Sequence, residues 1–292
     1  MHWLELVFLS AFALSAYDIA KKHAVSGNRV FSVLAITSFA GFSAVAAVLA
    51  ATGRLGAVLS ITPRIFVLLF AKSLLVGTSW ALAYWALKTL PVTVMAPIRA
   101  TGPVWVFALS LAVFGEVPSV VQAAGFALAF AGCIMFSLAA VREGFTLRDR
   151  SIWLAIGGTL AGAVSAIYDK CLIQRLALEP EQVLFWFMGG MTVIYLAAGC
   201  IVRTLRMDST PFAWRFTIPL TGILLAASDF LYFSAVSHPD ARISVLSVLR
   251  RTSVVWTFLL GGAIFRERNL LRKGIALAVL LAGVALLSLA RR

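Results

Sequence analysis

The stretch "IRATGPVWVF" (98–107) decides the fold, because it returns 151 residues later as "LRRTSVVWTF" (249–258). The residues paired by this offset include Arg99 and Arg250, Thr101 and Thr252, and Trp105 and Trp256. Two further matches share the offset: a Tyr-Asp pair at 17–18 and 168–169, and "FGE" at 114–116 with "FRE" at 265–267. Three separate matches at one offset predict that the chain consists of two repeats.

Both repeats are built from apolar segments of membrane-spanning length. Of the 292 residues, 61% are hydrophobic and 13% are charged, and the mean hydropathy of +0.97 lies far above that of soluble domains. A helix needs roughly 20 apolar residues to cross the bilayer core. The stretches of that length are 3–22, 30–51, 65–87, 91–113, 119–140, 152–174, 182–202, 213–236, 241–264 and 271–290. Since hydrocarbon satisfies no backbone polar group, these segments predict an all-α polytopic membrane protein with ten transmembrane helices.

The repeats are predicted to be inverted, because each contains five spans and five is an odd number. The first five-helix repeat covers 1–140, a connecting loop covers 141–151, and the second repeat covers 152–292. Inverted repeats are a recurring design of secondary transporters, whose substrate site lies near the middle of the membrane between the repeats. Transport is therefore the leading interpretation.

Charged residues inside the spans predict two ion pairs that gate the transporter. Counting 1.5 Å per residue along each helix places Asp18 with Arg99 near one membrane face, and Asp169 with Arg250 near the other. Charges inside a membrane usually pair with one another. The alternative interpretation is that these pairs only clamp helices together.

A third pair, Lys72 with Asp229, is predicted at similar depth but has no counterpart at the repeat offset. Such a pair is a candidate for substrate contact or proton coupling, and the alternative is a structural salt bridge. The candidate residues of the substrate cavity are Tyr17, Lys72, Ser79, Trp80, Tyr84, Arg99, Trp105, Tyr168, Asp229, Tyr232, Arg250 and Trp256. Pro97 and Pro103 flank Arg99 and predict a kink in that span.

Several other classes of function find no support in the sequence. The three cysteines have no disulfide or metal-site spacing, the three histidines are scattered, and no Walker, GxSxG or HExxH motif is present. We therefore expect no metal, no cofactor and no enzymatic activity. The net charge of +13 is interpreted as membrane topology and not as nucleic-acid binding.

The distribution of basic residues predicts the orientation in the membrane. Loops on the side opposite the N-terminus hold fourteen Lys and Arg residues, and loops on the N-terminal side hold six. The positive-inside rule then places both termini outside the cytoplasm, in a multi-pass protein of the cell inner membrane.

The segments "RATGPVWVFALSLAVFGE" (99–116) and "RRTSVVWTFLLGGAIFRE" (250–267) resemble the EamA-type branch of the drug/metabolite transporter superfamily. In that family the fourth span of each half carries a proline, then apolar residues, then Gly-Glu. Pro103, Gly115 and Glu116 match this pattern, whereas Val254 and Arg266 depart from it. The resemblance implies a basket of helices around a central cavity lined by spans 1, 3, 4, 6, 8 and 9.

The members that this chain resembles export amino acids, including aromatic amino acids. A cavity with both signs of charge and aromatic rings favours a zwitterion. We therefore expect an exporter of amino acids and related small metabolites that works by alternating access, as a monomer or homodimer in the lipid bilayer. The alternatives are a transporter of quaternary amines such as choline or of lipophilic drugs, and a channel or structural membrane protein.

Overall fold

The computed structural model describes residues 2–25, 27–89, 98–99, 101–138, 150–205, 210–253, 256 and 270–289, and these contain helices and no strand. The helices are α1 (Trp3–Val25), α2 (Val30–Ala51), α3 (Leu55–Leu59), α4 (Pro63–Thr89), α6 (Gly102–Phe114), α7 (Val120–Leu138), α8 (Arg150–Lys170), α9 (Pro180–Thr204), α10 (Thr217–Val236), α11 (Ile243–Leu249) and α13 (Leu270–Leu289). A π-helical turn, η1 (Cys171–Arg175), follows α8, and a 3-10 turn, η2 (Arg250–Thr252), follows α11.

Six helices among the described residues are long and apolar enough to cross a membrane. They are Trp3–Val25, Val30–Ala51, Pro63–Ala83, Arg150–Arg175, Pro180–Thr204 and Thr217–Val236, and shorter apolar helices cover Gly102–Phe114, Val120–Gly132 and Gly274–Leu287. The predicted all-helical membrane class is confirmed. The arrangement of ten spans as two inverted repeats stays a prediction, since the expected spans 91–113 and 241–264 lie partly outside the described residues.

The chain folds into two compact units, each of which takes residues from both expected repeats. Unit 1 comprises Met1–Gly77 and Cys171–Pro239, and unit 2 comprises Thr78–Lys170 and Asp240–Arg292. The units are defined by which helices pack together, whereas the predicted boundary at 141–151 divides the chain into two sequence repeats. The two divisions describe different properties, so the repeat boundary stays a prediction. Most of the connecting loop lies outside the described residues.

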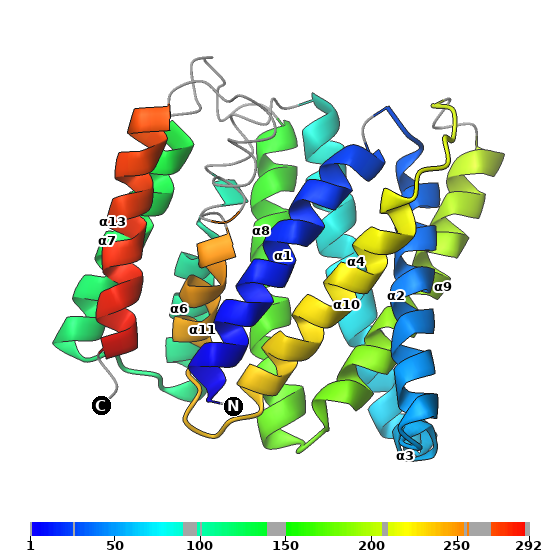
Figure 1. Cartoon of the computed structure of the whole chain (residues 1–292), viewed down its shortest axis with the longest axis horizontal. Helices are drawn as coiled ribbons and strands as arrows, with labels where there is room; N and C mark the ends of the chain where they lie inside the picture. Colours follow the sequence, from blue (N-terminus) through cyan, green and yellow to red (C-terminus); the bar gives the residue numbers. More distant parts are fainter. Residues whose placement is uncertain are drawn as a thin grey trace. The chain divides into compact units, whose positions relative to one another are not determined.

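Glycines let the helices of unit 1 approach closely. In this unit α1 packs along α10, and α2 packs against both α9 and α10 (Figure 1). A Cβ atom on Gly222 of α10 would lie 2.0 Å from the carbonyl oxygen of Thr37 on α2. Thr37 also donates a hydrogen bond from its hydroxyl to the carbonyl of Ile218, at 3.2 Å. Small residues at such positions are typical of packed membrane helices.

Unit 2 contains a second glycine-lined contact, in which α7 packs along α13 (Figure 1). A Cβ atom on Gly132 would lie 2.5 Å from the backbone nitrogen of Leu280, and one on Gly283 would lie 2.4 Å from that of Ala129. In the same unit, α6 packs against α8 and α11. These contacts hold the helices that carry the candidate site residues of unit 2.

The close approach of α2 and α10 makes Gly222 intolerant of a side chain. Gly222→Ala is expected to lower the free energy of unfolding by about 1–3 kcal/mol, because the added methyl group overpacks a backbone contact. The measurement is the midpoint of thermal unfolding in detergent. Gly56→Ala is the matched control, since Gly56 lies in helix α3 of the same unit with no atom within 4 Å of its ideal Cβ position. Equal midpoints for the two variants would contradict the assigned packing.

Candidate functional site

Unit 1 buries a lysine among aromatic rings. Lys72 lies on α4 with 2% of its surface exposed, about 14 Å from the start of the helix. Its ammonium group lies 4.5 Å from the ring centre of Phe187 on α9 and 4.8 Å from that of Phe233 on α10. The faces of these rings attract a cation and offset part of the cost of removing it from water.

A buried carboxylate, Asp229, lies on the helix that also carries Phe233. Asp229 is buried on α10, and it precedes Phe233 by four residues, so both residues share one face of the helix. Its position, about 11 Å from the end of α10, matches the depth of Lys72. The structure therefore associates both members of the predicted third pair with one face of α10.

Two of the predicted cavity tyrosines are also buried in unit 1. Tyr17 of α1 is buried, and the Lys21 ammonium lies 5.2 Å from the centre of its ring. Tyr232 is buried as well, with its ring 5.8 Å from that of Phe233. Unit 1 thus gathers four of the predicted cavity residues, Tyr17, Lys72, Asp229 and Tyr232, from three helices.

The other predicted cavity residues belong to unit 2. Ser79 donates a hydrogen bond to the carbonyl of Gly158 at 2.7 Å, which ties α4 to α8. Trp80, Tyr168 and Arg250 are half-buried, Trp105 and Trp256 are exposed, and the side chain of Tyr84 lies outside the described residues. The indole of Trp105 donates to the hydroxyl of Thr101 at 3.2 Å.

The two predicted gating pairs remain predictions. Asp18 and Arg99 are exposed and belong to different units. Asp169 is buried at the end of α8, and Arg250 begins η2, both in unit 2.

The kink expected near Arg99 stays a prediction, since residues 90–97 and 100 lie outside the described residues; Thr101 is a turn between the helical residues 98–99 and α6. Helix α6 begins at Gly102 and has Pro103 in its first turn, where the missing N–H leaves no hydrogen bond unmade. Pro103 therefore starts a helix, and Pro97 lies outside the described residues. Gly102 also makes room for Arg251, because a Cβ atom there would lie 2.8 Å from its guanidinium nitrogen.

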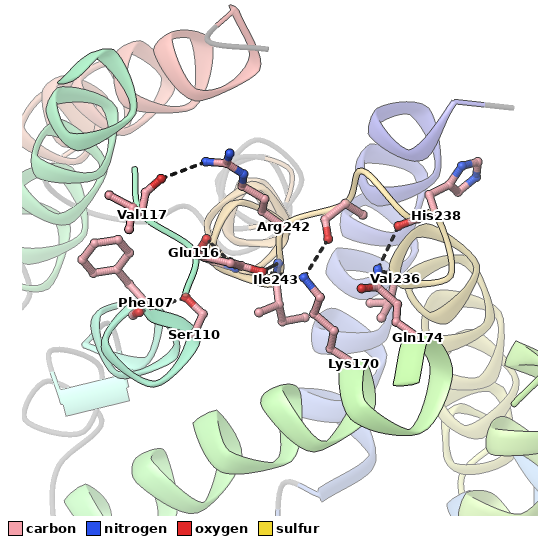
Figure 2. Close-up of polar contacts among 12 residues, drawn as sticks. Phe107, Ser110, Glu116, Val117, Lys170, Gln174, Val236, His238, Arg242 and Ile243 are labelled. Carbon is pink, nitrogen blue, oxygen red and sulfur yellow. Dashed lines mark hydrogen bonds and ion pairs between the residues drawn. The ribbon is translucent and has the colours of Figure 1, made fainter. Parts of the chain in front are cut away.

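Unit 2 contains a buried polar network around Glu116 that the sequence did not predict. Figure 2 shows it at the junction of α6, α8 and α11. Gly115 ends α6 in the left-handed conformation at φ 64°, and Glu116 follows it. One carboxylate oxygen accepts hydrogen bonds from the ammonium of Lys170 at 2.6 Å and from the backbone N–H of Ile243 at 3.1 Å. The other accepts from the hydroxyl and the backbone N–H of Ser244, at 2.6 and 3.3 Å.

The partners of Glu116 extend the network to other elements. Lys170 also donates to the carbonyl of Ala241 at 3.2 Å, and its ammonium lies 4.8 Å from the ring centre of Phe114. Arg242 donates to the carbonyl of Val117 at 3.2 Å (Figure 2). It also donates to the side-chain oxygen of Gln122 at 2.8 Å. The network therefore ties the ends of α6 and α8 to the starts of α7 and α11.

The turn η1 follows this network directly and is anchored in unit 1. The side-chain amide of Gln174 donates to the carbonyls of Val236 and His238, at 2.7 and 2.8 Å (Figure 2). A π-helical turn is rare and often marks a functional position. Here it begins two residues after Asp169, one of the predicted gating residues.

The environment of Glu116 keeps its carboxyl group ionised. Burial raises the pKa of Glu116, but the hydrogen bonds from Lys170 and Ser244 and the charge of Lys170 lower it by more. The pKa therefore lies below its usual value. A carboxyl with a lowered pKa contributes stability that is present at neutral pH and is lost as the pH falls through that pKa.

No group of three or more His, Cys, Asp and Glu side chains in the described part of the chain is placed to hold a metal ion. Cys171 and Cys200 are unpaired thiols. The polar clusters around Lys72 and Glu116 are therefore suited to ion pairing and hydrogen bonding.

Glu116→Gln is expected to lower the free energy of unfolding by about 3–5 kcal/mol at neutral pH, because it leaves the buried Lys170 charge without its partner. The difference from the wild type should shrink as the pH falls through the lowered pKa of Glu116, because the wild-type carboxyl then becomes neutral. The measurement is thermal unfolding in detergent over a pH series.

Glu181→Gln is the control for this comparison. Glu181 pairs with Arg54 at 2.7 Å, but the Arg54 side chain is 57% exposed, and surface pairs contribute only about 0–1 kcal/mol. An equal decrease in the free energy of unfolding for the two variants would show that the Glu116–Lys170 pair stabilises the fold no more than a surface pair does.

Comparisons with other proteins show the fold and a family match over part of the chain. A solved structure titled only as the crystal structure of a protein is similar over 98% of this chain and 96% of its own, with a TM-score of 0.78 and 17% identity. At that identity the similarity shows the fold alone. No curated protein matches the chain in sequence. Residues 1–138, which are just under half of the chain, match the model of the EamA-like transporter family.

Proposed function

We propose that the protein is a secondary transporter that exports amino acids and related small metabolites by alternating access. The family match over residues 1–138 supports transport of a small molecule across a membrane, and the six candidate spans support a multi-pass location. Neither finding distinguishes among substrates. The observation that carries the substrate class is the burial of Lys72 against the rings of Phe187 and Phe233, together with the burial of Asp229 on α10 of the same unit.

A zwitterion complements these buried groups. Its carboxylate would bind the Lys72 ammonium, its amino group would bind the Asp229 carboxylate, and its side chain would contact Phe187, Phe233 or Tyr17. Ionisable residues inside membrane spans are costly and mark substrate pathways or proton relays. In the absence of substrate, Lys72 and Asp229 would neutralise each other.

Matching contacts in the two units support the inverted repeat. In unit 1, Ser10 donates a hydrogen bond to the carbonyl of Ser228 at 2.8 Å and links α1 to α10. In unit 2, Ser79 donates to the carbonyl of Gly158 at 2.7 Å and links α4 to α8. The offset of 151 relates α1 to α8 and α4 to α10, so these contacts are equivalent to within three residues.

In this proposal the repeats exchange roles during transport. The pairs Asp18–Arg99 and Asp169–Arg250 would act as gates on opposite sides of the site. The turn η1 supports a gating role for the second pair, since its irregular backbone directly follows α8. The excess of basic residues on one side supports an inner-membrane protein with both termini outside the cytoplasm.

Substrate recognition is tested by uptake of labelled amino acids into liposomes that contain the purified protein. Lys72→Met is expected to raise KM at least tenfold, because it removes a charged contact of about 1.4 kcal/mol or more. Arg64→Gln is the control, since Arg64 is an exposed cation at the start of the same helix, and its KM should not change. Uptake of choline with no uptake of amino acids would overturn the substrate class, and a flux that does not saturate would indicate a channel.

The role of Asp229 is tested separately by the pH dependence of uptake. If Asp229 carries the coupling proton, Asp229→Asn should abolish the acceleration caused by a pH gradient. Full pH dependence in this variant would exclude Asp229 as the proton site.

The gate on the Arg99 side is tested by charge exchange. Arg99→Gln should abolish uptake, and the double variant Asp18→Arg/Arg99→Asp should recover part of it, because the exchange restores opposite charges. Normal uptake by Arg99→Gln would show that the pair is not a gate.

A further inference from the structure

The connection between α9 and α10 presents aromatic side chains to its surroundings. The sequence "TPFAWRF" (210–216), here called the 210–216 segment, precedes α10 and has no regular secondary structure before the turn at Phe216. Phe212, Trp214 and Phe216 are 39%, 64% and 77% exposed. Three exposed aromatic residues within five positions form an apolar surface that a soluble protein would rarely leave uncovered.

Hydrogen bonds to the α1–α2 connection hold the 210–216 segment in place. The buried Asn28 donates to the carbonyl of Ala213 at 2.7 Å, and the backbone N–H of Ala213 donates back to Asn28 at 3.0 Å. Arg29 donates from its Nε to the carbonyl of Thr210 at 3.1 Å. The exposure of the rings is therefore a consequence of a backbone tied at two points.

Basic residues surround these aromatic residues. Arg215 donates to the carbonyl of His23, and the His23 ring nitrogen lies 3.1 Å from the Thr217 hydroxyl. Arg29 and Arg215 each use a guanidinium nitrogen for a backbone carbonyl, and a guanidinium has five N–H donors.

The local charge remains positive when the nearby acids are counted. Lys21 and His23 lie in the last turns of α1, where Asp18 is the exposed acid, whereas the other exposed acid of the helix, Glu5, lies in its first turn. Residues 206–209 lie outside the described residues and contain one arginine and one aspartate, so their formal charges cancel.

The position of this surface relative to the spans identifies its surroundings. Candidate spans end at Val25 and Thr204 and begin at Val30 and Thr217, so both connections lie at span ends. Figure 1 shows the two connections at the same end of unit 1, in agreement with the Asn28 hydrogen bonds. The boundary between hydrocarbon and water therefore falls here, where tryptophan is enriched and basic residues contact lipid phosphates.

We propose that the 210–216 segment, together with Arg29, forms a docking surface for anionic phospholipids. The rings of Phe212, Trp214 and Phe216 enter the region between headgroups and acyl chains, and Arg29 and Arg215 bind the phosphates. The excess positive charge favours anionic over zwitterionic headgroups. Because Asn28 and Arg29 join the α1–α2 connection to the start of α10, a lipid bound here stabilises this corner of unit 1.

The test measures binding of phosphatidylglycerol and phosphatidylcholine to the full-length protein in detergent by native mass spectrometry. The double variant Arg29→Gln/Arg215→Gln is expected to bind phosphatidylglycerol about 30-fold more weakly, since each basic residue near the surface contributes about 1 kcal/mol, or about fivefold. Phosphatidylcholine binding should change little. The affinity for phosphatidylglycerol should also fall as the salt concentration rises.

Three controls distinguish a charge contact with the lipid from altered folding and from simple anion binding. Arg64→Gln removes one exposed charge from the start of α4 and should bind phosphatidylglycerol like the wild type. Arg29→Lys/Arg215→Lys keeps the charge but changes the hydrogen bonds to Thr210 and His23, so retained binding assigns the effect to charge and not to altered folding. Inorganic phosphate should neither bind measurably nor compete at millimolar concentration.

Two outcomes would overturn the proposal. One is equal phosphatidylglycerol binding by the wild type and the Arg29→Gln/Arg215→Gln variant. The other is a dimer of the wild type that Trp214→Ala converts to a monomer, which would assign the aromatic surface to a second copy of the chain. Neither outcome depends on transport activity, so the result is independent of the proposed substrate.

Discussion

A charge inside an apolar helix bundle must be compensated by the protein itself, because hydrocarbon offers it no partner. This constraint organises both units. In unit 1 the Lys72 ammonium lies against the rings of Phe187 and Phe233. In unit 2 the Lys170 ammonium is held by the Glu116 carboxylate, which also accepts the first backbone N–H groups of α11. Each compensating group comes from a different segment of the chain than the lysine it contacts, so the requirement for charge compensation also fixes how these segments assemble.

The helices could be predicted from the sequence because membrane thickness sets their length. The expected span 30–51 coincides with α2, and 182–202 lies within α9. The residues that contact each other across different helices could not be predicted from segment length. Lys170 is 54 residues from Glu116 along the chain. The repeat pattern contains its neighbour Asp169, which matches Asp18, but it gives no indication for Lys170 itself. The Gly-Glu pattern marked position 116, but no local pattern pointed to its partner.

The charged residues buried in unit 1 could be singled out from the sequence, whereas the phenylalanines beside Lys72 could not. Lys72 and Asp229 are conspicuous because charges are rare in apolar spans. Phe187 and Phe233 carry no such signal, since the chain contains 21 phenylalanines and only packing selects the two beside Lys72. The 210–216 segment is a similar case. Its composition suited the start of a span, whereas Ala213 exchanges hydrogen bonds with the side chain of Asn28 and the helix begins only at Thr217.

The shared carboxylate of Glu116 also has an evolutionary consequence. Lys170 and Ser244 both direct their side chains to this one group, and Gly115 supplies the left-handed turn that precedes it. A substitution at one of these positions leaves the remaining side chains without their hydrogen-bond partner or without the required turn. Substitutions at these positions should therefore be correlated among homologues. Homologues that lose the acid at position 116 should therefore also lose the lysine at position 170, and positions 115, 116, 170 and 244 should diverge as a set.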